Sequence, residues 1–565
     1  MKAKNFFIPY ILFIFHPLDI SADPLYERIY VQTDKQLYLS GEPVLMKFVT
    51  INTEQIPIAY SKIAYAELVS DTMALLQIKV ELTGGAGAGR MLLPADLPTG
   101  YYRVIAYTQN MRNEGADVFF EKNIAVLNTF QSGYHPAEEE HALPNPTQPD
   151  PQNFKPETLN LKLDQKTYMT RTHGELTVNG LPQNIYTLAV SIAGKDCIPD
   201  AESDISLFQK NQTKKPTAFS GKFLPEYEGH IVTGKLIDNQ TGVPATSDIA
   251  SLSTGVSFPT GDGIRYFSGQ KTETGDIRFC TSSISGTNEI ATVVFRADDR
   301  YRVDIQSPFV SSYAPTIMPS LQVHVADYEQ LLDRSVALQL FRYFADDTSE
   351  LQTVSEPHFK MKPTNSYLLD EYTRFSSMRE MFIEFIRGAR FRTNEEKQEL
   401  SVFNKTGSEL IYGSVPLVLL DGVPITDHNL IYHYDPLTVE QINIYYGPCI
   451  FGSSRFDGIV EMVTFRRLHA NLNLNRSVQI TSYDGTQLPY RLNIPDYSKK
   501  ENIQKREPDG RHTLLWESEV KTNGKTSIRL PFNTSDLTGE FQATVEGITG
   551  EGQFIFATGW FQVVE

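Results

Sequence analysis

The stretch that decides the fold begins Pro416-Leu-Val-Leu-Leu-Asp-Gly-Val-Pro424 and, after an acidic loop, continues Val439-Glu-Gln-Ile-Asn-Ile-Tyr-Tyr-Gly-Pro448. It ends Phe451-Gly-Ser-Ser-Arg-Phe-Asp-Gly-Ile-Val460. Short apolar runs bounded by Gly, Pro and Asp are typical of strands joined by tight turns. We therefore expect a series of short paired strands here.

The order of these elements resembles the plug domain of TonB-dependent outer-membrane receptors. In such plugs an apolar strand ends in an Asp-Gly-Val-Pro turn, and a second strand leads into a Gly-Pro loop and a Gly-Ser turn before the last strand. The resemblance implies a small α+β domain, here at 323–470. A plugged barrel needs on the order of 22 strands of roughly 10 residues each, for which residues 468–565 are too few. We expect a plug-like domain without its barrel, and no transport.

Two helices are predicted in this region. One spans 327–343, where Tyr, Leu, Ala and Phe side chains form a broad apolar face. The other spans 377–387, between a capping-box pair, Ser377 and Glu380, and a stop at Gly388. Plugs begin with such a helix. We therefore assign its Met and Phe side chains to the domain core, in preference to a ligand groove.

A β-sandwich is predicted at 24–130. Residues 29–48 contain a strand, a turn at Gly41-Glu42 and a strand that alternates between two faces. Thr-Asp-Lys, Tyr and Gly-Glu in this order resemble the opening of a macroglobulin-type domain, and 97–106 resembles a late strand of such domains. Another immunoglobulin-like sandwich is the alternative.

A weak repeat predicts a second macroglobulin-like sandwich at 157–224. Asp34-Lys-Gln-Leu-Tyr38 recurs as Asp164-Gln-Lys-Thr-Tyr168, each followed by a polar turn and an alternating strand. Between the two copies, 131–156 is rich in Pro and acidic residues, which is typical of an extended linker. Cation binding by its acidic run and His141 is a weaker alternative.

Two further sandwiches are predicted, at 225–322 and at 471–565. Residues 234–244 and 272–279 resemble the carboxypeptidase regulatory-like domain, in which a strand enters an Asn-x-Thr-Gly-x-Pro turn and a later Gly-Asp turn opens the next strand. In the terminal region, Leu537-Thr-Gly539 resembles Leu97-Pro-Thr-Gly100 at the start of the late macroglobulin-type strand. Because regulatory-like modules often precede receptor plugs in surface proteins of Bacteroidetes, the resemblance implies an envelope protein of that group.

The expected fold class is mainly β: tandem immunoglobulin-like or macroglobulin-type β-sandwiches plus a small α+β plug-like domain. The composition agrees, since 28 Tyr and 33 Phe, with 32 Pro and 36 Gly, favour many short aromatic-rich strands separated by turns. A length of 565 residues accommodates several such domains.

The first residues predict export. Lys2 and Lys4 precede an apolar run at 6–15, and Ser21-Ala22 offers a cleavage site, so 1–22 has the features of a signal peptide. A retained anchor is the weaker alternative, because about 20 apolar residues are needed to span a bilayer. We expect a mature protein without a transmembrane span, in the periplasm or at the outer membrane or cell surface of a Gram-negative bacterium.

Net charge limits the classes of partner, and the number and placement of cysteines argue against a disulfide framework. A formal net charge of −17 argues against nucleic acid and anionic lipid, which both require clustered Lys and Arg. Cys197, Cys280 and Cys449 cannot all pair and lie in different predicted domains, so we expect three buried thiols. An envelope protein or a polymer is the expected ligand, with association to the outer membrane through partners.

No catalytic residues, cofactor site or metal site are predicted. Asn52-Thr-Glu-Gln55 has the Glu-Gln of a macroglobulin thioester but no Cys two residues earlier, and phosphate-loop, nucleophile-elbow and zinc-helix motifs are not found. The acidic plug-like loop, which includes His433, could hold a metal or serve acid-base chemistry, although polar plug loops commonly do neither. We assign it as a tentative partner-binding loop with the residues Asp421, Asp427, His428 and Asp435.

These features favour a non-catalytic binding or scaffold protein of the cell envelope, accessory to outer-membrane or surface assemblies. The first alternative is a macroglobulin-like protein that interacts with proteases without a thioester. The second is an enzyme whose site is built from loops and leaves no linear motif.

Overall fold

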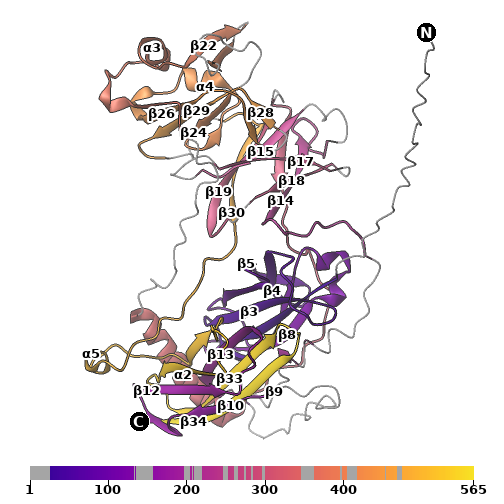
Figure 1. Cartoon of the computed structure of the whole chain (residues 1–565), viewed down its shortest axis with the longest axis vertical. Helices are drawn as coiled ribbons and strands as arrows, with labels where there is room; N and C mark the ends of the chain where they lie inside the picture. Colours follow the sequence, from indigo (N-terminus) through magenta and orange to yellow (C-terminus); the bar gives the residue numbers. More distant parts are fainter. Residues whose placement is uncertain are drawn as a thin grey trace, which may run out of the picture.

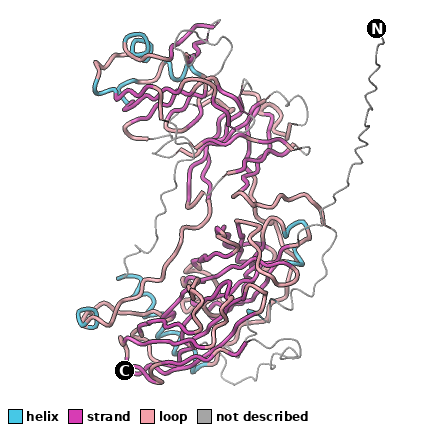
Figure 2. Tube along the Cα trace, in the orientation of Figure 1, coloured by secondary structure: helices cyan, strands magenta, loops and turns pink. Residues whose placement is uncertain are grey.

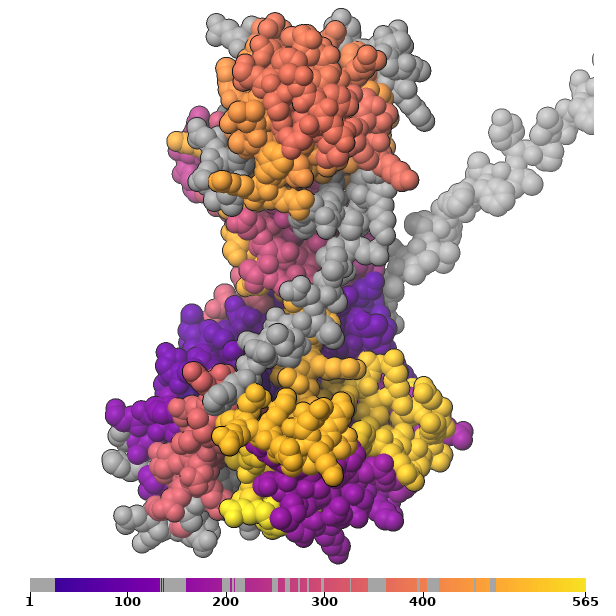
Figure 3. All heavy atoms as spheres, turned by 90° about the vertical axis from the view of Figure 1, so that its left-hand side faces the viewer, coloured from indigo at the N-terminus to yellow at the C-terminus, as the bar shows by residue number. Residues whose placement is uncertain are grey.

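The computed structural model describes residues 26–132, 157–195, 219–245, 252–259, 265–272, 275–281, 284–295, 299–344, 362–394, 397–403, 416–451, 454–467 and 474–565, together with Tyr134, Pro136, Asp204, Ile205 and Phe208. The predicted signal peptide 1–22 and most of the predicted linker 131–156 lie outside these residues. The chain forms two lobes joined by a narrow waist (Figure 1, Figure 3). Strands dominate both lobes (Figure 2), so the expected mainly β fold is confirmed.

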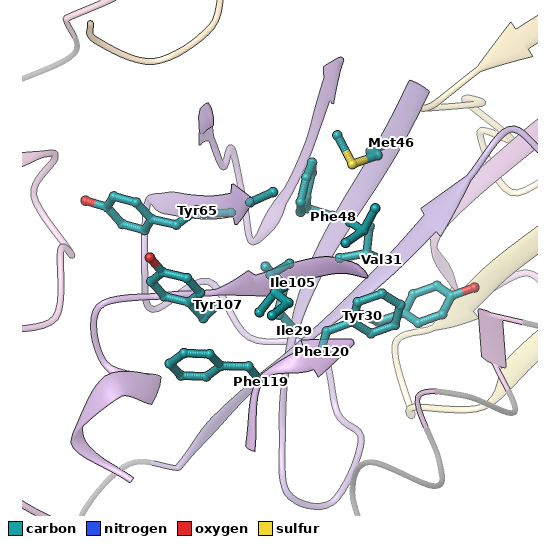
Figure 4. Packing of buried hydrophobic residues seen from close by; sticks show 14 of the residues in the cluster. Ile29, Tyr30, Val31, Met46, Phe48, Tyr65, Ile105, Tyr107, Phe119 and Phe120 are labelled. Carbon is teal, nitrogen blue, oxygen red and sulfur yellow. The ribbon is translucent and has the colours of Figure 1, made fainter. Parts of the chain in front are cut away.

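The first sandwich packs sheet β1-β3-β6 against sheet β2-β8-β7-β4-β5. Side chains from both sheets, among them Phe48, Tyr65 and Tyr107, form its core (Figure 4). Every residue of β1 is buried because its other face packs on the second sandwich, where the rings of Tyr30 and Phe554 lie 5.4 Å apart. The elements are β1 (Glu27–Thr33), β2 (Leu37–Leu39), β3 (Pro43–Asn52), β4 (Ile63–Ser70), β5 (Met73–Glu81), β6 (Ala86–Leu92), β7 (Gly100–Tyr107), β8 (Phe120–Leu127) and the short 3-10 helices η1 (Met111–Asn113) and η2 (Ala116–Val118).

The second sandwich is built from two distant parts of the chain. β13 pairs with β33 and β31, and β12 pairs with β32; the two parts lie together at the foot of the lower lobe (Figure 3). The predicted separate sandwiches at 157–224 and 471–565 are therefore one sandwich. Its strands are β9 (Glu157–Thr158), β10 (Asn160–Leu163), β11 (Thr167–Met169), β12 (His173–Asn179), β13 (Ile185–Gly194), β31 (Thr513–Glu517), β32 (Ser527–Asn533), β33 (Gly539–Thr549) and β34 (Phe554–Val564).

The upper lobe contains a third sandwich, with sheets β17-β18-β14-β20 and β16-β15-β19-β30. Its last strand, β30, follows the domain at 365–464 that was predicted to be plug-like; we keep the name plug-like domain for it, while its relation to receptor plugs stays a prediction. This domain is therefore inserted in the third sandwich, and the whole upper lobe is inserted in the second one. The strands are β14 (Ile231–Asp238), β15 (Ser253–Ser257), β16 (Tyr266–Ser268), β17 (Gln270–Lys271), β18 (Asp276–Cys280), β19 (Thr287–Phe295), β20 (Tyr301–Ile305) and β30 (Val478–Asp484).

The plug-like domain has a sheet in the order β21-β26-β29-β24-β25, whose three central strands are the apolar runs expected from the sequence. The expected helix begins after Ser377, whose side chain accepts from Glu380 N, but it ends at Glu384. The elements are β21 (Asn365–Leu368), η4 (Leu369–Glu371), α3 (Met378–Glu384), β22 (Ala389–Asn394), β23 (Lys397–Val402), β24 (Leu417–Leu420), β25 (Val423–Pro424), α4 (His428–Tyr432), η5 (Pro436–Thr438), β26 (Val439–Tyr445), β27 (Cys449–Phe451), β28 (Ser454–Phe456) and β29 (Ile459–Thr464).

The α-helices α2 and α5 lie outside the plug-like domain. α2 (Val325–Phe344) returns to the lower lobe, where Leu331 packs with Leu37 and Leu127 of the first sandwich; α5 (Lys500–Ile503) follows the upper lobe. None of the described helices has the length and hydropathy needed to cross a bilayer.

The cysteines depart in part from expectation. Cys449 is a buried free thiol, whereas Cys280 is free but exposed, because its side chain lies on the outer face at the end of β18. Cys197 lies outside the described residues.

Candidate functional site

Asp421 of the predicted binding loop forms the turn between β24 and β25. Asp421 and Gly422 both have positive φ, 49° and 82°, which suits a two-residue hairpin turn. The Asp421 carboxylate accepts hydrogen bonds from N and Oγ1 of Thr464, each at 2.6 Å. This carboxylate therefore anchors the end of β29.

Asp427 and Asp435 are helix caps. Asp427 Oδ1 accepts from Asn429 N at 3.0 Å at the start of α4, and Asp435 Oδ1 accepts from Leu437 N at 2.9 Å at the start of η5. Such caps satisfy backbone N–H groups that have no partner within the helix. Both side chains lie at the surface, and their role in partner binding stays a prediction.

His428 is only 8% exposed. Its Nδ1 accepts a hydrogen bond from Leu400 N of β23 at 3.0 Å, which places the ring proton on Nε2. Burial lowers the pKa of His428 to about 4, although Asp427 acts in the opposite direction. His428 is thus a neutral structural link between α4 and β23. His433 is exposed beside it, at the C-cap of α4.

A groove of about 450 Å³ lies on the same domain, between α3, β22 and the end of β26. We call it the α3 groove. Its apolar lining combines buried Phe382 and Ile386 with Ile383, which is 61% exposed. Phe403, Tyr446, Arg387, Gly388, Ala389 and Arg390 complete the lining.

Hydrogen bonds fix the backbone at one end of the α3 groove. Asn365 Nδ2 donates to the Tyr446 hydroxyl at 2.7 Å and to Arg387 O at 3.0 Å. Gly388 has φ of 101°, and a Cβ at this position would lie 2.0 Å from the Tyr446 hydroxyl oxygen. Glycine is therefore required here, because it allows both the left-handed backbone and the close approach of the tyrosine.

The rim of the α3 groove is cationic. Arg387 and Arg390 are exposed, and neither guanidinium forms an ion pair within the described part of the chain. Arg390 lies 5.8 Å from the ring centre of Phe403. The net charge of the chain is −17, yet this hollow carries two exposed guanidinium groups at its rim. Such a surface suits an apolar side chain next to a carboxylate.

The sequence did not predict the α3 groove, because the Met and Phe side chains of this helix were assigned to the core. Phe382 and Ile386 are indeed buried, but they also form the floor of the groove. One signal was available: arginines recur at 387, 390 and 392, immediately after an apolar helix.

Three buried polar side chains are in contact at the waist: the carboxylate of Glu226, the imidazole of His230 and the phenol of Tyr483. His230 Nδ1 lies 2.7 Å from Glu226 Oε1, and His230 Nε2 contacts the Tyr483 hydroxyl. Tyr65 of the first sandwich donates to Glu226 at 2.9 Å. Burial lowers the pKa of His230, against the effect of Glu226. Since His230 is fully buried and Tyr483 is 7% exposed, these groups face no substrate and instead connect the lobes.

A larger hollow, of about 940 Å³, lies between α2 and the ends of β13, β33 and β34. Two of its carboxylates are already in ion pairs: Asp536 with Arg171 and Glu540 with Lys195. No group of three His, Cys, Asp or Glu side chains among the described residues is placed to hold a metal ion. The α3 groove, with its unpaired charges and exposed apolar side chain, is the better candidate site.

No protein-family model and no curated protein matches this chain. Solved structures similar to it include Escherichia coli alpha-2-macroglobulin activated by porcine elastase, at 8% identity over 95% of this chain and 44% of that one, with a TM-score of 0.24. Salmonella alpha-2-macroglobulin reacted with methylamine is similar at 10% identity over 96% of this chain and 40% of that one, with a TM-score of 0.23.

The chain thus spans less than half the length of these macroglobulins. The assignment of β-sandwiches rests on the strand pairings described above. The resemblances to a receptor plug and to a carboxypeptidase regulatory-like domain, and the origin in Bacteroidetes, stay predictions.

Proposed function

We propose that this chain is a non-catalytic binding protein of a Gram-negative cell envelope, exported through its N-terminal signal, that holds a protein partner in the α3 groove. The observation that carries the proposal is the pair of exposed guanidinium groups of Arg387 and Arg390 at the rim of an apolar hollow, neither of which is in an ion pair with another described residue. The sandwiches serve as the scaffold that presents this domain.

The chemistry of the α3 groove defines the segment that it would accept. The aromatic and aliphatic floor takes one large apolar side chain, and burial of such an anchor in a hollow commonly dominates the binding energy of an interface. Each guanidinium can form two parallel hydrogen bonds to a carboxylate. The expected ligand is therefore a peptide segment in which an aromatic or aliphatic residue is flanked by Asp or Glu.

A peptide array tests this function. We expect the full-length protein to bind peptides that carry an apolar residue flanked by Asp or Glu, and to bind less well as salt is raised. The double variant Arg387→Glu with Arg390→Glu should bind such peptides roughly tenfold more weakly or worse, because charge-assisted hydrogen bonds of about 1.5–3 kcal/mol are lost.

The matched control is Arg476→Glu with Arg491→Glu, which changes the net charge equally at exposed arginines outside the α3 groove. This control should bind as the unmodified protein does. Equal loss in both double variants would show that net charge, and not the α3 groove, governs binding and would reject the proposed site.

A further inference from the structure

A buried group of three ionisable side chains lies between the two sandwiches of the lower lobe. Lys122 comes from β8, Glu546 from β33, and Asp204 from the connection between β13 and β14. The side chains of Lys122 and Asp204 are 2% and 6% exposed, and Glu546 is 5% exposed. Three different segments therefore meet at one dry site, which we call the Lys122–Asp204–Glu546 triad.

The amine and the carboxyl group of this triad are in direct contact. Lys122 Nζ lies 2.5 Å from Asp204 Oδ1 and also contacts Thr33 Oγ1. Asp204 Oδ2 accepts from Thr33 N at 3.0 Å, which holds the carboxyl group in place. Oδ1 of Asp204 is buried and has no hydrogen-bond donor among the described residues, so its contact with Lys122 Nζ lacks the geometry of a hydrogen bond. The nitrogen is thus held against an oxygen that is bonded to the carboxyl carbon.

Glu546, the third residue of the triad, is suited to transfer protons. Burial raises the pKa of Glu546 to about 8, and the charge of Asp204 adds to the increase while Lys122 opposes it. Glu546 is therefore mostly protonated at neutral pH, and the Tyr30 hydroxyl donates to it. The rings of Phe208 and Phe554 pack edge-on against Tyr30 at 5.6 and 5.4 Å, which keeps this side of the site apolar.

We propose that Lys122 and Asp204 form an intramolecular isopeptide bond, with Glu546 as the proton-transferring carboxyl group. In this reaction a proton first passes from the Lys122 ammonium to the Asp204 carboxylate that it contacts. The neutral amine then attacks Asp204 Cγ, a C–N bond forms and the C–O bond to the hydroxyl breaks. Glu546 takes a proton from the nitrogen and returns one to the departing hydroxyl, which leaves as water. The ammonium and carboxylate together become one amide and one water molecule, so no oxidant or further reactant is needed.

Two physical effects favour this bond. The fixed contact replaces an encounter in solution, which is worth many orders of magnitude in effective concentration. In addition, a buried ion pair carries a desolvation penalty for both ions, and conversion to a neutral amide removes both charges. The bond would fasten the connection between the lobes to the first sandwich at a point far from the α3 groove, so this proposal is independent of partner binding.

Mass spectrometry of the purified full-length protein tests the bond. We expect an intact mass lower by one water than the mass of the same chain without the bond, and a branched tryptic peptide that joins Lys122 to Asp204. Trypsin should also fail to cut after Lys122, because an acylated lysine is not a substrate.

Lys122→Arg is the matched variant, because it keeps the positive charge but removes the amine. Its mass should differ from that of the unmodified protein by the substitution plus one water. Glu546→Gln, which retains the shape of the side chain, should also lack the branched peptide. Linear peptides that end at Lys122 in the digest of the unmodified protein, or loss of water that persists in Lys122→Arg, would overturn the proposal.

Discussion

At the scale of single residues, His428 shows how one buried imidazole makes the stability of the plug-like domain depend on pH. Its Nδ1 must stay unprotonated to accept the hydrogen bond from Leu400 N. Burial, the larger effect, lowers its pKa from 6.5 to about 4, while the neighbouring Asp427 raises it. The folded state therefore binds a proton less readily at this side chain than the unfolded state does.

We predict an acid-dependent loss of stability from His428. Because its folded pKa is depressed, its contribution is complete above pH 6.5 and is lost as pH falls through about 4. A shift of this size corresponds to about 3 kcal/mol at 1.36 kcal/mol per pKa unit. Hydrogen exchange of the Leu400 amide measures the unfolding of the plug-like domain, and the stability that it reports should fall over this pH range. His428→Gln should flatten it, whereas His433→Gln should not; parallel pH profiles in all three proteins would contradict the assignment.

At the scale of elements, α2 shows how a buried ion pair docks a helix. Arg334 donates to Glu42 from Nε at 3.1 Å and from Nη2 at 2.6 Å, and both side chains are at most 5% exposed. Burial would raise the pKa of Glu42, but Arg334 and Lys35 outweigh it and hold this pKa below its usual value. The pairing fixes α2 against the turn that precedes β3.

We predict that Arg334→Ala destabilises the lower lobe by about 3 kcal/mol, because removal of one partner leaves a buried charge without full compensation. Lys35 remains 3.2 Å from Glu42 and limits the loss. Denaturant unfolding measures the change, and Asp333→Ala on the exposed side of the same helix is the control. Equal, small effects of both substitutions would show that α2 docks through its apolar contacts alone.

At the scale of the whole molecule, the chain has a nested arrangement, in which one domain is inserted within another. The second sandwich begins with β9 to β13 and is completed by β31 to β34. The described residues between β13 and β31 form the upper lobe, α2 and α5, together with short segments that pack on the first sandwich through Ile205, Phe208 and Tyr313. The two ends of the insertion are adjacent, since Gly194 N donates to His512 O at 3.0 Å. Figure 1 shows the chain passing between the lobes more than once.

We predict that the insertion can be removed without loss of the second sandwich. A chain in which residues 196–511 are replaced by a short Gly/Ser linker should unfold cooperatively, because all the pairings of β13 with β31 and β33 remain. The control fragment 26–194 lacks those partners, and its strands β9 to β13 should show little protection from hydrogen exchange. A fragment 26–194 with full protection would contradict the nested arrangement.

Local signals in the sequence determined the local structure. The Asp421-Gly422 turn, the N-cap at Ser377 and the apolar runs of β24, β26 and β29 could be predicted because each depends on a few consecutive residues. The mainly β class followed in the same way from composition and turn spacing. The sequence also placed a repeat at Tyr38 and Tyr168, each of which donates to the aspartate four residues earlier.

Only the tertiary structure decided which distant segments meet. β13 pairs with β33 across more than three hundred residues, and no local pattern encodes such a partner because strand pairing depends on what else competes for the edge. The same holds for the α3 groove and for Lys122 beside Asp204. A side chain's type sets its chemistry, but its burial and neighbours are set by chain segments that are remote in sequence.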